Sequence, residues 1–200
     1  MIDLLSDIGS ILLLVLAGII LYFMLRDRSI TYYIVPSLTN PEFTSETRTI
    51  LTRSKITNRY TINEVTDKQL ADIVIELRSR ASLDKDHSKI EYYPGTDKPI
   101  RFSFTWQRPK PYIAIDDVNW TYGVKESGLT LKEYRQYVIR HEFMHALGFD
   151  HQPCNEKTAV NGVCPVLYQA TRGPPYGFRS GYDATDIDYT KKLDNPYFSY

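Results

Sequence analysis

Hydrophobic residues follow several distinct patterns along this 200-residue chain. Residues 8–25 form one uncharged and mostly apolar run. Beyond residue 28, short runs of β-branched and aromatic residues alternate with polar, turn-rich stretches, a pattern that predicts β-strands. The five strands that we expect lie at residues 30–35, 60–65, 71–77, 100–106 and 112–118.

Helical spacing of apolar residues predicts a long helix that ends near Gly148. Thr130 and Glu133 form the Thr-x-x-Glu pattern of an N-terminal capping box, and Gly148 can adopt the positive φ angle that ends a helix. One face of this helix collects residues at helical spacing, namely Leu131, Tyr134, Val138, His141 and His145. We expect this face to lie against the rest of the domain.

Two shorter helices and one loop complete the expected elements. A helix is expected within residues 45–58, which start with a Ser-Glu pair and contain apolar residues at helical spacing. Residues 184–193 have the pattern of a last short helix, and residues 82–99 that of a polar loop with a Pro-Gly turn. The expected order is therefore strand, helix, four strands and the long helix, followed by a turn-rich C-terminal part.

The composition limits the class of protein. About 170 residues remain after the apolar run, enough for one domain with a hydrophobic core. We therefore divide the chain into an N-terminal segment, residues 1–28, and one domain, residues 29–200. Lys plus Arg and Asp plus Glu are equal, at 24 each, so no overall charge attracts nucleic acid and we expect no such partner.

The apolar run at residues 8–25 has the length that an α-helix needs to cross the hydrocarbon core of a bilayer. We expect it to be an uncleaved, single-pass membrane anchor in contact with lipid. A cleaved signal peptide is the alternative, but Asp3 and Asp7 precede the run where a positive charge is typical. The residues that follow the run also lack a small-residue cleavage site.

Three of the four histidines fall within eleven positions, in the sequence HEFMHALGFDH. At this composition, the complete motif would arise by chance in on the order of a few chains per million. His141 and His145 are four apart on the expected helix, so both rings lie on one face, and Gly148 lets the chain turn back and bring His151 to them. The alternative, ordinary core or surface histidines on an amphipathic helix, does not explain three histidines at this spacing.

This spacing indicates a catalytic zinc site. Three imidazole nitrogens can bind one Zn²⁺ ion at about 2.0–2.1 Å and leave a fourth position open for water. Glu142 lies beside His141 but off the line of the ligands, where it can act as a general base. In the reaction that we expect, zinc lowers the pKa of its water, Glu142 takes the proton, the hydroxide attacks a peptide carbonyl, and Glu142 returns the proton to the leaving amine.

The motif His-Glu-x-x-His-x-x-Gly-x-x-His, complete here from His141 to His151, resembles that of the metzincin clan of zinc metallopeptidases. Residues 134–171 further resemble an uncharacterised, metzincin-like domain family best represented in actinobacteria. The resemblance is looser over the expected strands and absent from the apolar run. It implies a compact α+β domain with a mixed, mostly parallel five-stranded sheet above an active-site helix and a small C-terminal subdomain below.

One position departs from the clan pattern. Metzincins carry a methionine in the turn beneath the zinc, and the alignment of CPVLYQAT places Leu167 at that position. Leucine has a similar volume, and such swaps usually cost less than about 1.5 kcal/mol, so we expect Leu167 to form the hydrophobic floor of the site. Tyr168 lies one residue too early to match the tyrosine ligand of some metzincins, and we interpret it as a packing or cleft residue.

The resemblance also implies a substrate and a way to bind it. An extended peptide would lie antiparallel to the strand at residues 100–106, and residues 171–183 would form a wall of the pocket for the residue after the cut. We therefore expect a membrane-anchored zinc endopeptidase that acts on a peptide or protein. The alternative is a non-enzymatic membrane or envelope assembly protein that kept the fold. Glu142 favours the enzyme, because a purely structural site needs no general base.

Two signals disagree about the side of the membrane on which the domain lies. Arg26 and Arg28 follow the apolar run, which by the positive-inside rule places the domain in the cytoplasm. Cys154 and Cys164 are the only cysteines and can close a disulfide, which persists only in an oxidising compartment. Two free thiols are the alternative for the pair. Because the cysteine pair is the more specific signal, we favour an exoplasmic domain in which the two cysteines are bonded.

Overall fold

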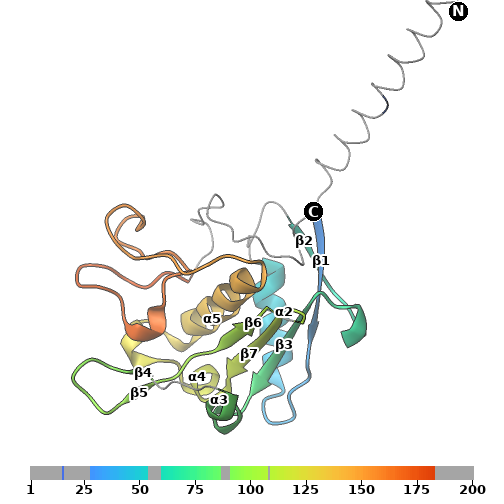
Figure 1. The fold of residues 1–200 in the computed structure, drawn as a ribbon, viewed down its shortest axis with the longest axis horizontal. Helices are drawn as coiled ribbons and strands as arrows, with labels where there is room; N and C mark the ends of the chain where they lie inside the picture. The colour runs from blue at the N-terminus through green and yellow to red at the C-terminus, as the bar shows by residue number, and fades with distance from the viewer. Residues whose placement is uncertain (1–14, 16–27, 54–59, 87–90, 108, 183–200) are drawn as a thin grey trace, which may run out of the picture.

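The fold is built on a five-stranded sheet with the strand order β2-β1-β3-β7-β6 (Figure 1). The four neighbouring strands β2, β1, β3 and β7 run parallel to one another. β6 pairs antiparallel to β7 at one edge of the sheet. The predicted α+β class and the mixed, mostly parallel sheet of five strands are therefore confirmed. The strand bounds are Arg28–Ile34 for β1, Tyr60–Glu64 for β2, Ile73–Arg78 for β3, Phe104–Trp106 for β6 and Tyr112–Asp116 for β7.

The structure is a computed structural model that describes residue 15 and residues 28–53, 60–86, 91–107 and 109–182. Within these residues, no helix has both the length and the apolar character needed to cross a membrane. Apart from residue 15, the apolar run at residues 8–25 lies outside the described part, as does the helix expected at residues 184–193. Both therefore stay predictions.

The strand expected at residues 100–106 is divided between two sheets. β5 (Pro99–Ile100) pairs with β4 (Glu91–Tyr92) in a separate two-stranded ribbon, and only the last three expected residues join the main sheet as β6. Between β5 and β6, the hydroxyl of Ser103 accepts a hydrogen bond from the backbone N–H of Asp116 (3.1 Å). The N–H of Asp116 is thus bonded to a side chain instead of to the backbone of a neighbouring strand. The alternation of apolar and polar residues did not predict this break in the strand.

Short helices that the sequence analysis missed follow two of the strands. α3 (Arg80–Asp86) extends into the segment expected to be a loop, and α4 (Asp117–Tyr122) begins where β7 ends. Asp116 explains the second helix, because its carboxylate accepts the backbone N–H of Asn119 (2.7 Å) and so caps α4. The same buried carboxylate pairs with Arg80 (2.7 Å), so one side chain ties β7, α3 and α4 together.

The two longer helices begin at side-chain caps. α2 (Glu42–Arg53) begins earlier than expected, because the side-chain oxygen of Asn40 accepts the N–H of Phe43 (3.1 Å). α5 (Leu131–Ala146) has the predicted capping box. The backbone N–H of Thr130 donates to the Glu133 carboxylate (2.9 Å), and the N–H of Glu133 donates to the Thr130 hydroxyl (3.3 Å).

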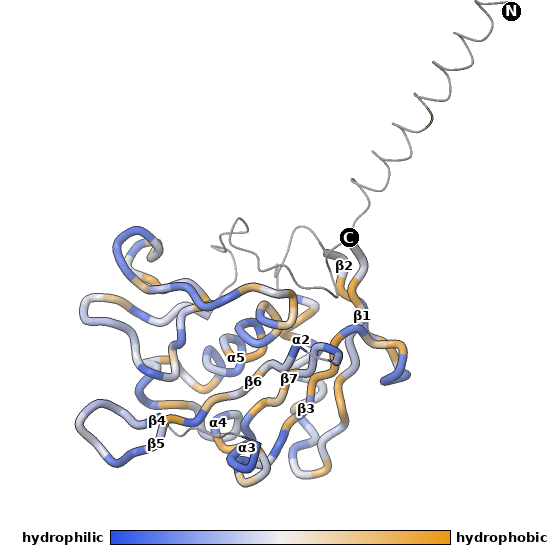
Figure 2. Tube along the Cα trace, viewed as in Figure 1, coloured by the Kyte–Doolittle hydropathy of each residue, from blue (hydrophilic) through white to orange (hydrophobic). Residues whose placement is uncertain are grey.

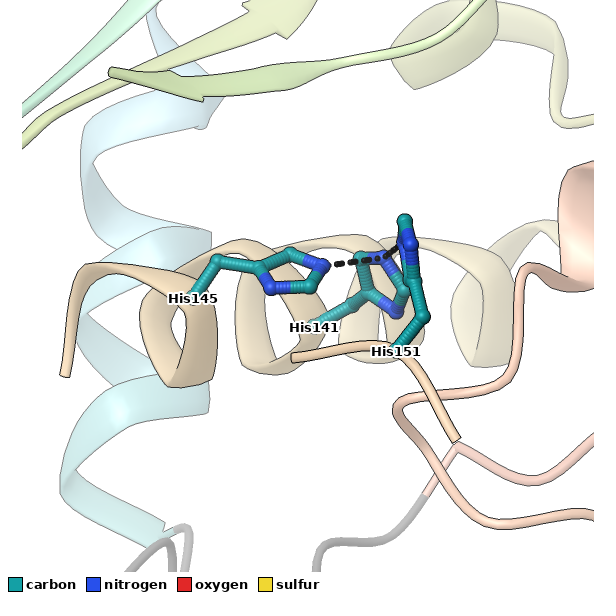
Figure 3. Close-up of side chains that lie close together, drawn as sticks. All are labelled: His141, His145 and His151. Atoms are coloured by element: carbon teal, nitrogen blue, oxygen red, sulfur yellow. Dashed lines mark hydrogen bonds between the residues drawn. The ribbon is translucent and has the colours of Figure 1, made fainter. Parts of the chain in front are cut away.

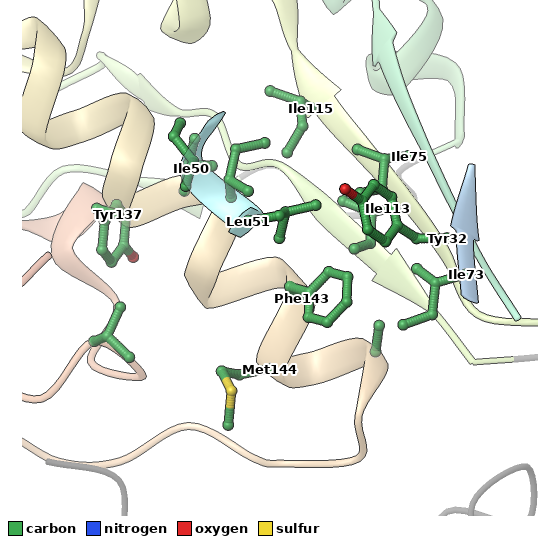
Figure 4. Close-up of a cluster of buried hydrophobic side chains, with 14 of the residues drawn as sticks. Tyr32, Ile50, Leu51, Ile73, Ile75, Ile113, Ile115, Tyr137, Phe143 and Met144 are labelled. Atoms are coloured by element: carbon green, nitrogen blue, oxygen red, sulfur yellow. The ribbon is translucent and has the colours of Figure 1, made fainter. Parts of the chain in front are cut away.

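The hydrophobic core lies between the sheet and the helices α2 and α5. Figure 4 shows side chains from these elements meeting there, and Figure 2 shows the hydrophobic residues concentrated along the strands. Tyr32 of β1 contacts Phe143 of α5 edge to face, with ring centroids 6.3 Å apart. Every residue of α5 from Tyr137 to Met144 is buried, so this part of the helix is covered on all sides.

Residues 149–182 form a C-terminal part made of loops and one short 3₁₀ helix, η3 (Ala170–Arg172). A disulfide joins Cys154 to Cys164 within it. α5 lies between this part and the sheet (Figure 1). The C-terminal loops therefore pack against the side of α5 that faces away from the sheet. α5 carries two of the three motif histidines, His141 and His145.

Candidate metal centre

Three histidine side chains meet at the C-terminal end of α5 (Figure 3). Nε2 of His141 lies 3.1 Å from Nε2 of His145 and 3.3 Å from Nε2 of His151. Within the described part of the chain, this is the one group of three or more potential metal ligands whose ligand atoms all lie within 4.8 Å of one another. The structure thus brings together the three histidines that the motif predicted.

Hydrogen bonds on the other ring nitrogen fix the tautomer of two of these histidines. Nδ1 of His141 donates to the carbonyl oxygen of Val166 (2.8 Å), and Nδ1 of His145 donates to that of Phe149 (2.7 Å). Burial lowers the pKa of His141 well below its ordinary value and the pKa of His145 to about 4, so both rings are neutral at neutral pH. Their Nε2 atoms then carry only lone pairs. Two lone pairs at this distance repel each other unless a cation lies between them.

The spacing of the Nε2 atoms fits a tetrahedral metal ion. Bonds of about 2.0–2.1 Å place neighbouring ligand atoms of a tetrahedral ion about 3.3–3.4 Å apart. The observed distances of 3.1 and 3.3 Å are close to this value. The three histidines can therefore hold a metal ion, and their geometry and imidazole nitrogens suit zinc.

The turn after α5 brings the third histidine to the site. Gly148 has a φ of 88°, a conformation that side-chain-bearing residues rarely adopt. Its N–H donates to the carbonyl of His145 (2.8 Å), and the N–H of Phe149 donates to that of Met144 (3.1 Å). The turn thereby satisfies carbonyls at the helix end while it leads the chain back toward His151.

Glu142 is buried beside the histidines and lines the same cleft. The hydroxyl of Thr105 on β6 lies 2.7 Å from its Oε2 atom and 3.0 Å from its backbone carbonyl. Burial raises the pKa of Glu142 to about 7, and the hydrogen bond from Thr105 opposes part of this rise. A carboxyl group with this pKa can both accept and return a proton at neutral pH.

A tight turn lies beneath the histidines and contains Leu167. The N–H of Tyr168 donates to the carbonyl of Pro165 (2.9 Å), which closes the turn, and Leu167 within it is fully buried. The carbonyl of the preceding residue, Val166, binds the ring of His141, and the carbonyl of Leu167 itself accepts the N–H of Gln152 (3.1 Å). Leu167 is therefore a buried residue next to the carbonyl that binds His141, and its role as the floor of the site stays a prediction.

Tyr168 is tied to the chain next to it. Its hydroxyl donates to the carbonyl of Gly173 (2.8 Å). This contact agrees with the interpretation of Tyr168 as a packing residue of the C-terminal part.

The partners that orient the site were not predicted from the sequence. Val166 and Phe149 act through backbone carbonyls, and a carbonyl carries no residue-type signal in a sequence. Thr105 is distant in the chain and contacts Glu142 only because β6 lies along α5. Tyr137 could have been found, because it lies one helical turn before His141, and its ring centroid lies 5.1 Å from that of His141.

A cleft of about 600 Å³ opens over the histidines. β6 and the residues before it, including Phe102, line one side, and Gln169 and Arg172 of the C-terminal part also line the cleft. β6 is the edge strand of the main sheet, paired with β7 alone within the described residues. The candidate site therefore lies below an unpaired strand edge.

A model of one protein family, described as "Protein of unknown function (DUF3152)", matches residues 45–177, about two thirds of the chain. The match includes the three histidines, Glu142 and both cysteines. No curated protein matches the sequence.

Removal of one ligand tests the metal centre. The full-length, zinc-supplemented protein is expected to hold one zinc ion per chain, and His151→Ala is expected to weaken zinc binding because the ion loses one of three protein ligands. Elemental analysis measures the zinc, with circular dichroism as the check on folding. The matched control is His87→Ala, which removes the one histidine outside the motif and should leave the zinc content unchanged. A natively folded wild-type protein without zinc would contradict this prediction.

Substitution of Leu167 tests the floor of the site. Leu167→Met is expected to change the free energy of unfolding by no more than about 1.5 kcal/mol and to preserve zinc binding. Leu167→Asn is expected to lower both stability and zinc affinity, because it buries an amide among apolar residues. Chemical denaturation and zinc titration measure the two effects. If Leu167→Asn changes neither quantity, the residue does not support the metal centre.

Proposed function

This chain belongs to the DUF3152 family, and we propose that it is a zinc-dependent endopeptidase. The observation that carries the proposal is the convergence of three histidine Nε2 atoms beside a buried glutamate, at the base of an open cleft. Three protein nitrogens, an open fourth position and an adjacent carboxylate are the combination typical of zinc hydrolases. A purely structural zinc site would instead be closed by a fourth protein ligand.

In this proposal His141, His145 and His151 hold the zinc ion. When bound, zinc supplies Lewis-acid chemistry, activating water and stabilising negative charge on the oxygen of the substrate carbonyl. The two hydrogen bonds from Nδ1 atoms to backbone carbonyls keep the rings of His141 and His145 oriented and make their Nε2 atoms better ligands.

Glu142 serves as the general base and then as the general acid. Its carboxyl group has a pKa of about 7, so it accepts a proton from the attacking water and returns it to the leaving amine at nearly equal cost. Thr105 acts as a positioning residue, because its hydroxyl binds Oε2 and restricts the rotation of the carboxylate. Burial excludes bulk water from this group and strengthens its electrostatic interactions with the reacting atoms.

The unpaired edge of β6 supplies a place for the substrate. An extended peptide can add to this edge as an antiparallel strand, with backbone hydrogen bonds to β6. A peptide bound there runs along the cleft that contains the histidines and Glu142. Backbone binding of this kind suits a polypeptide substrate better than a small molecule.

We further propose that residues 8–25 anchor the enzyme in a membrane and that the domain lies on the exoplasmic side. The disulfide between Cys154 and Cys164 supports this location, because such bonds are rare in reducing compartments. The bond closes a short loop in the C-terminal part, and a loop of this length is worth about 3 kcal/mol of chain entropy.

Replacement of the general base tests the activity. Glu142→Gln is expected to retain fold and zinc but to lower peptide turnover by about a hundredfold or more, because general-base catalysis is lost. Cleavage of a peptide library, followed by mass spectrometry, measures turnover. Glu64→Gln, which changes a glutamate of β2 that is paired with Arg48 at the sheet edge opposite to β6, is the matched control and should keep the wild-type rate. A wild-type protein that binds zinc but cuts no peptide would favour the assembly-protein alternative.

The state of the cysteines tests the location. Alkylation of the native, unreduced protein followed by mass spectrometry is expected to leave both Cys154 and Cys164 unmodified, because they are bonded to each other. Alkylation after reduction should modify both residues. Two modified cysteines in protein isolated without reductant would instead make the cytoplasmic side, which Arg26 and Arg28 favour, the better assignment.

A further inference from the structure

Arg172 is the one arginine or lysine among the described residues that line the metal-site cleft. The acidic side chains of the lining are Glu91, Glu142 and Asp150. Among the lining residues that the structure describes, Arg172 is therefore the one side chain besides the histidines that can carry a positive charge.

The guanidinium of Arg172 contacts two other residues of the cleft lining, Glu91 and Phe102. Nη2 lies 2.6 Å from Oε2 of Glu91, and the guanidinium lies over the ring of Phe102, 5.7 Å from its centroid. The ion pair connects η3 of the C-terminal part with β4 of the two-stranded ribbon. The two side chains are 51% and 50% exposed, so a ligand in the cleft can reach both of them.

This guanidinium has unused hydrogen-bonding capacity. An arginine side chain presents five N–H donors, and within the described residues Glu91 is the one hydrogen-bond partner of the Arg172 guanidinium. An ion pair exposed to this degree contributes little to stability. A ligand carboxylate can therefore bind the remaining N–H groups, or displace Glu91, at small cost.

Two hydrogen bonds fix the backbone just before Arg172. The carbonyl of Thr171 accepts the hydroxyl of Tyr93 (2.8 Å), and the N–H of Ala170 donates to the hydroxyl of Tyr137 (3.0 Å). Arg172 thus combines a fixed backbone with an exposed guanidinium that has N–H donors to spare. This arrangement suits a residue that recognises a ligand, because little conformational entropy is lost on binding.

We propose that Arg172 is a specificity-determining residue that binds a carboxylate of the peptide substrate. The carboxylate belongs either to an Asp or Glu side chain near the cut or to the C-terminus of the peptide. This inference names the substrate class of the proposed peptidase and rests on that proposed function. Glu91 acts as an internal competitor that occupies Arg172 when no substrate carboxylate is bound.

A peptide library tests the preference. With the full-length, zinc-supplemented protein, we expect Asp and Glu to be enriched over Asn and Gln at one position near the cut by about tenfold or more, the discrimination of one charge-assisted hydrogen bond. Arg172→Gln is expected to abolish this enrichment, and Arg172→Glu to reverse it in favour of Lys and Arg. Glu91→Gln is expected to increase it, because the competitor is removed.

Matched peptides separate the two sources of the carboxylate. If a side chain binds Arg172, replacing that Glu with Gln in the best substrate slows its cleavage, while amidation of the C-terminus has no effect. If the terminal carboxylate binds, amidation slows cleavage and the cuts lie at a constant distance from the C-terminus. Both patterns support the inference, provided that Arg172→Gln removes them.

Arg48→Gln is the control, because Arg48 is also a half-exposed, ion-paired arginine but lies outside the cleft. It is expected to keep the wild-type preference. The inference is overturned if the wild-type enzyme shows no acidic preference, if Arg172→Gln retains it, or if Arg48→Gln loses it to the same extent.

A binding measurement separates failure of this inference from failure of the proposed function. Fluorescence anisotropy compares a labelled Glu-containing peptide with its Gln-containing counterpart on the full-length protein, and it needs no cleavage. A preference for the Glu-containing peptide that disappears in Arg172→Gln supports the inference even if no peptide is cut. Equal binding of both peptides by a protein that cuts peptides efficiently overturns the inference and leaves the proposed peptidase activity standing.

Discussion

The hydrogen bond from Nδ1 of His141 to the carbonyl of Val166 is the contact on which the arrangement of the site depends. It joins the middle of α5 to the turn below it and leaves Nε2 of His141 without a proton, facing the other two histidines. A ring without this partner would be free to rotate or to change tautomer, and the three nitrogens would no longer converge. The bond forms because α5 is covered by the sheet on one side and by the C-terminal loops on the other.

Burial of this helix has a cost that a metal ion would relieve. His141 and Glu142 are both almost completely buried, and burial shifts both pKa values toward the neutral forms of the side chains. The lone pairs on Nε2 of neutral His141 and His145 face each other at 3.1 Å and repel, and a cation bound between them would remove this repulsion. Metal binding is therefore coupled to the stability of the surrounding structure.

The buried base and the exposed rim of the cleft have different physical roles. At the base, hydrogen bonds hold three of the polar side chains in place: His141 bonds Val166, His145 bonds Phe149, and Thr105 bonds Glu142. The rim carries the exposed ion pair between Arg172 and Glu91, whose partners can change when a ligand binds. In the proposed peptidase, the buried helix would therefore carry the reaction chemistry, and the loops and the strand edge would select the substrate.

Local rules along the chain were sufficient for the approximate positions of most strands of the main sheet, the capping box of α5, the turn at Gly148 and the spacing of the three histidines, because each depends on residues close in sequence. The capping Asp116, which ends β7 early and starts α4, shows where such rules fail: its partners Ser103 and Arg80 come from other segments. Only the tertiary structure decided which carbonyls orient the histidines, which hydroxyl holds Glu142, and that Arg172 lies in the cleft opposite Glu91. Except for the bond between His145 and Phe149, these contacts join residues more than twenty positions apart through backbone atoms or polar side chains, and such contacts leave no periodic signal in the sequence.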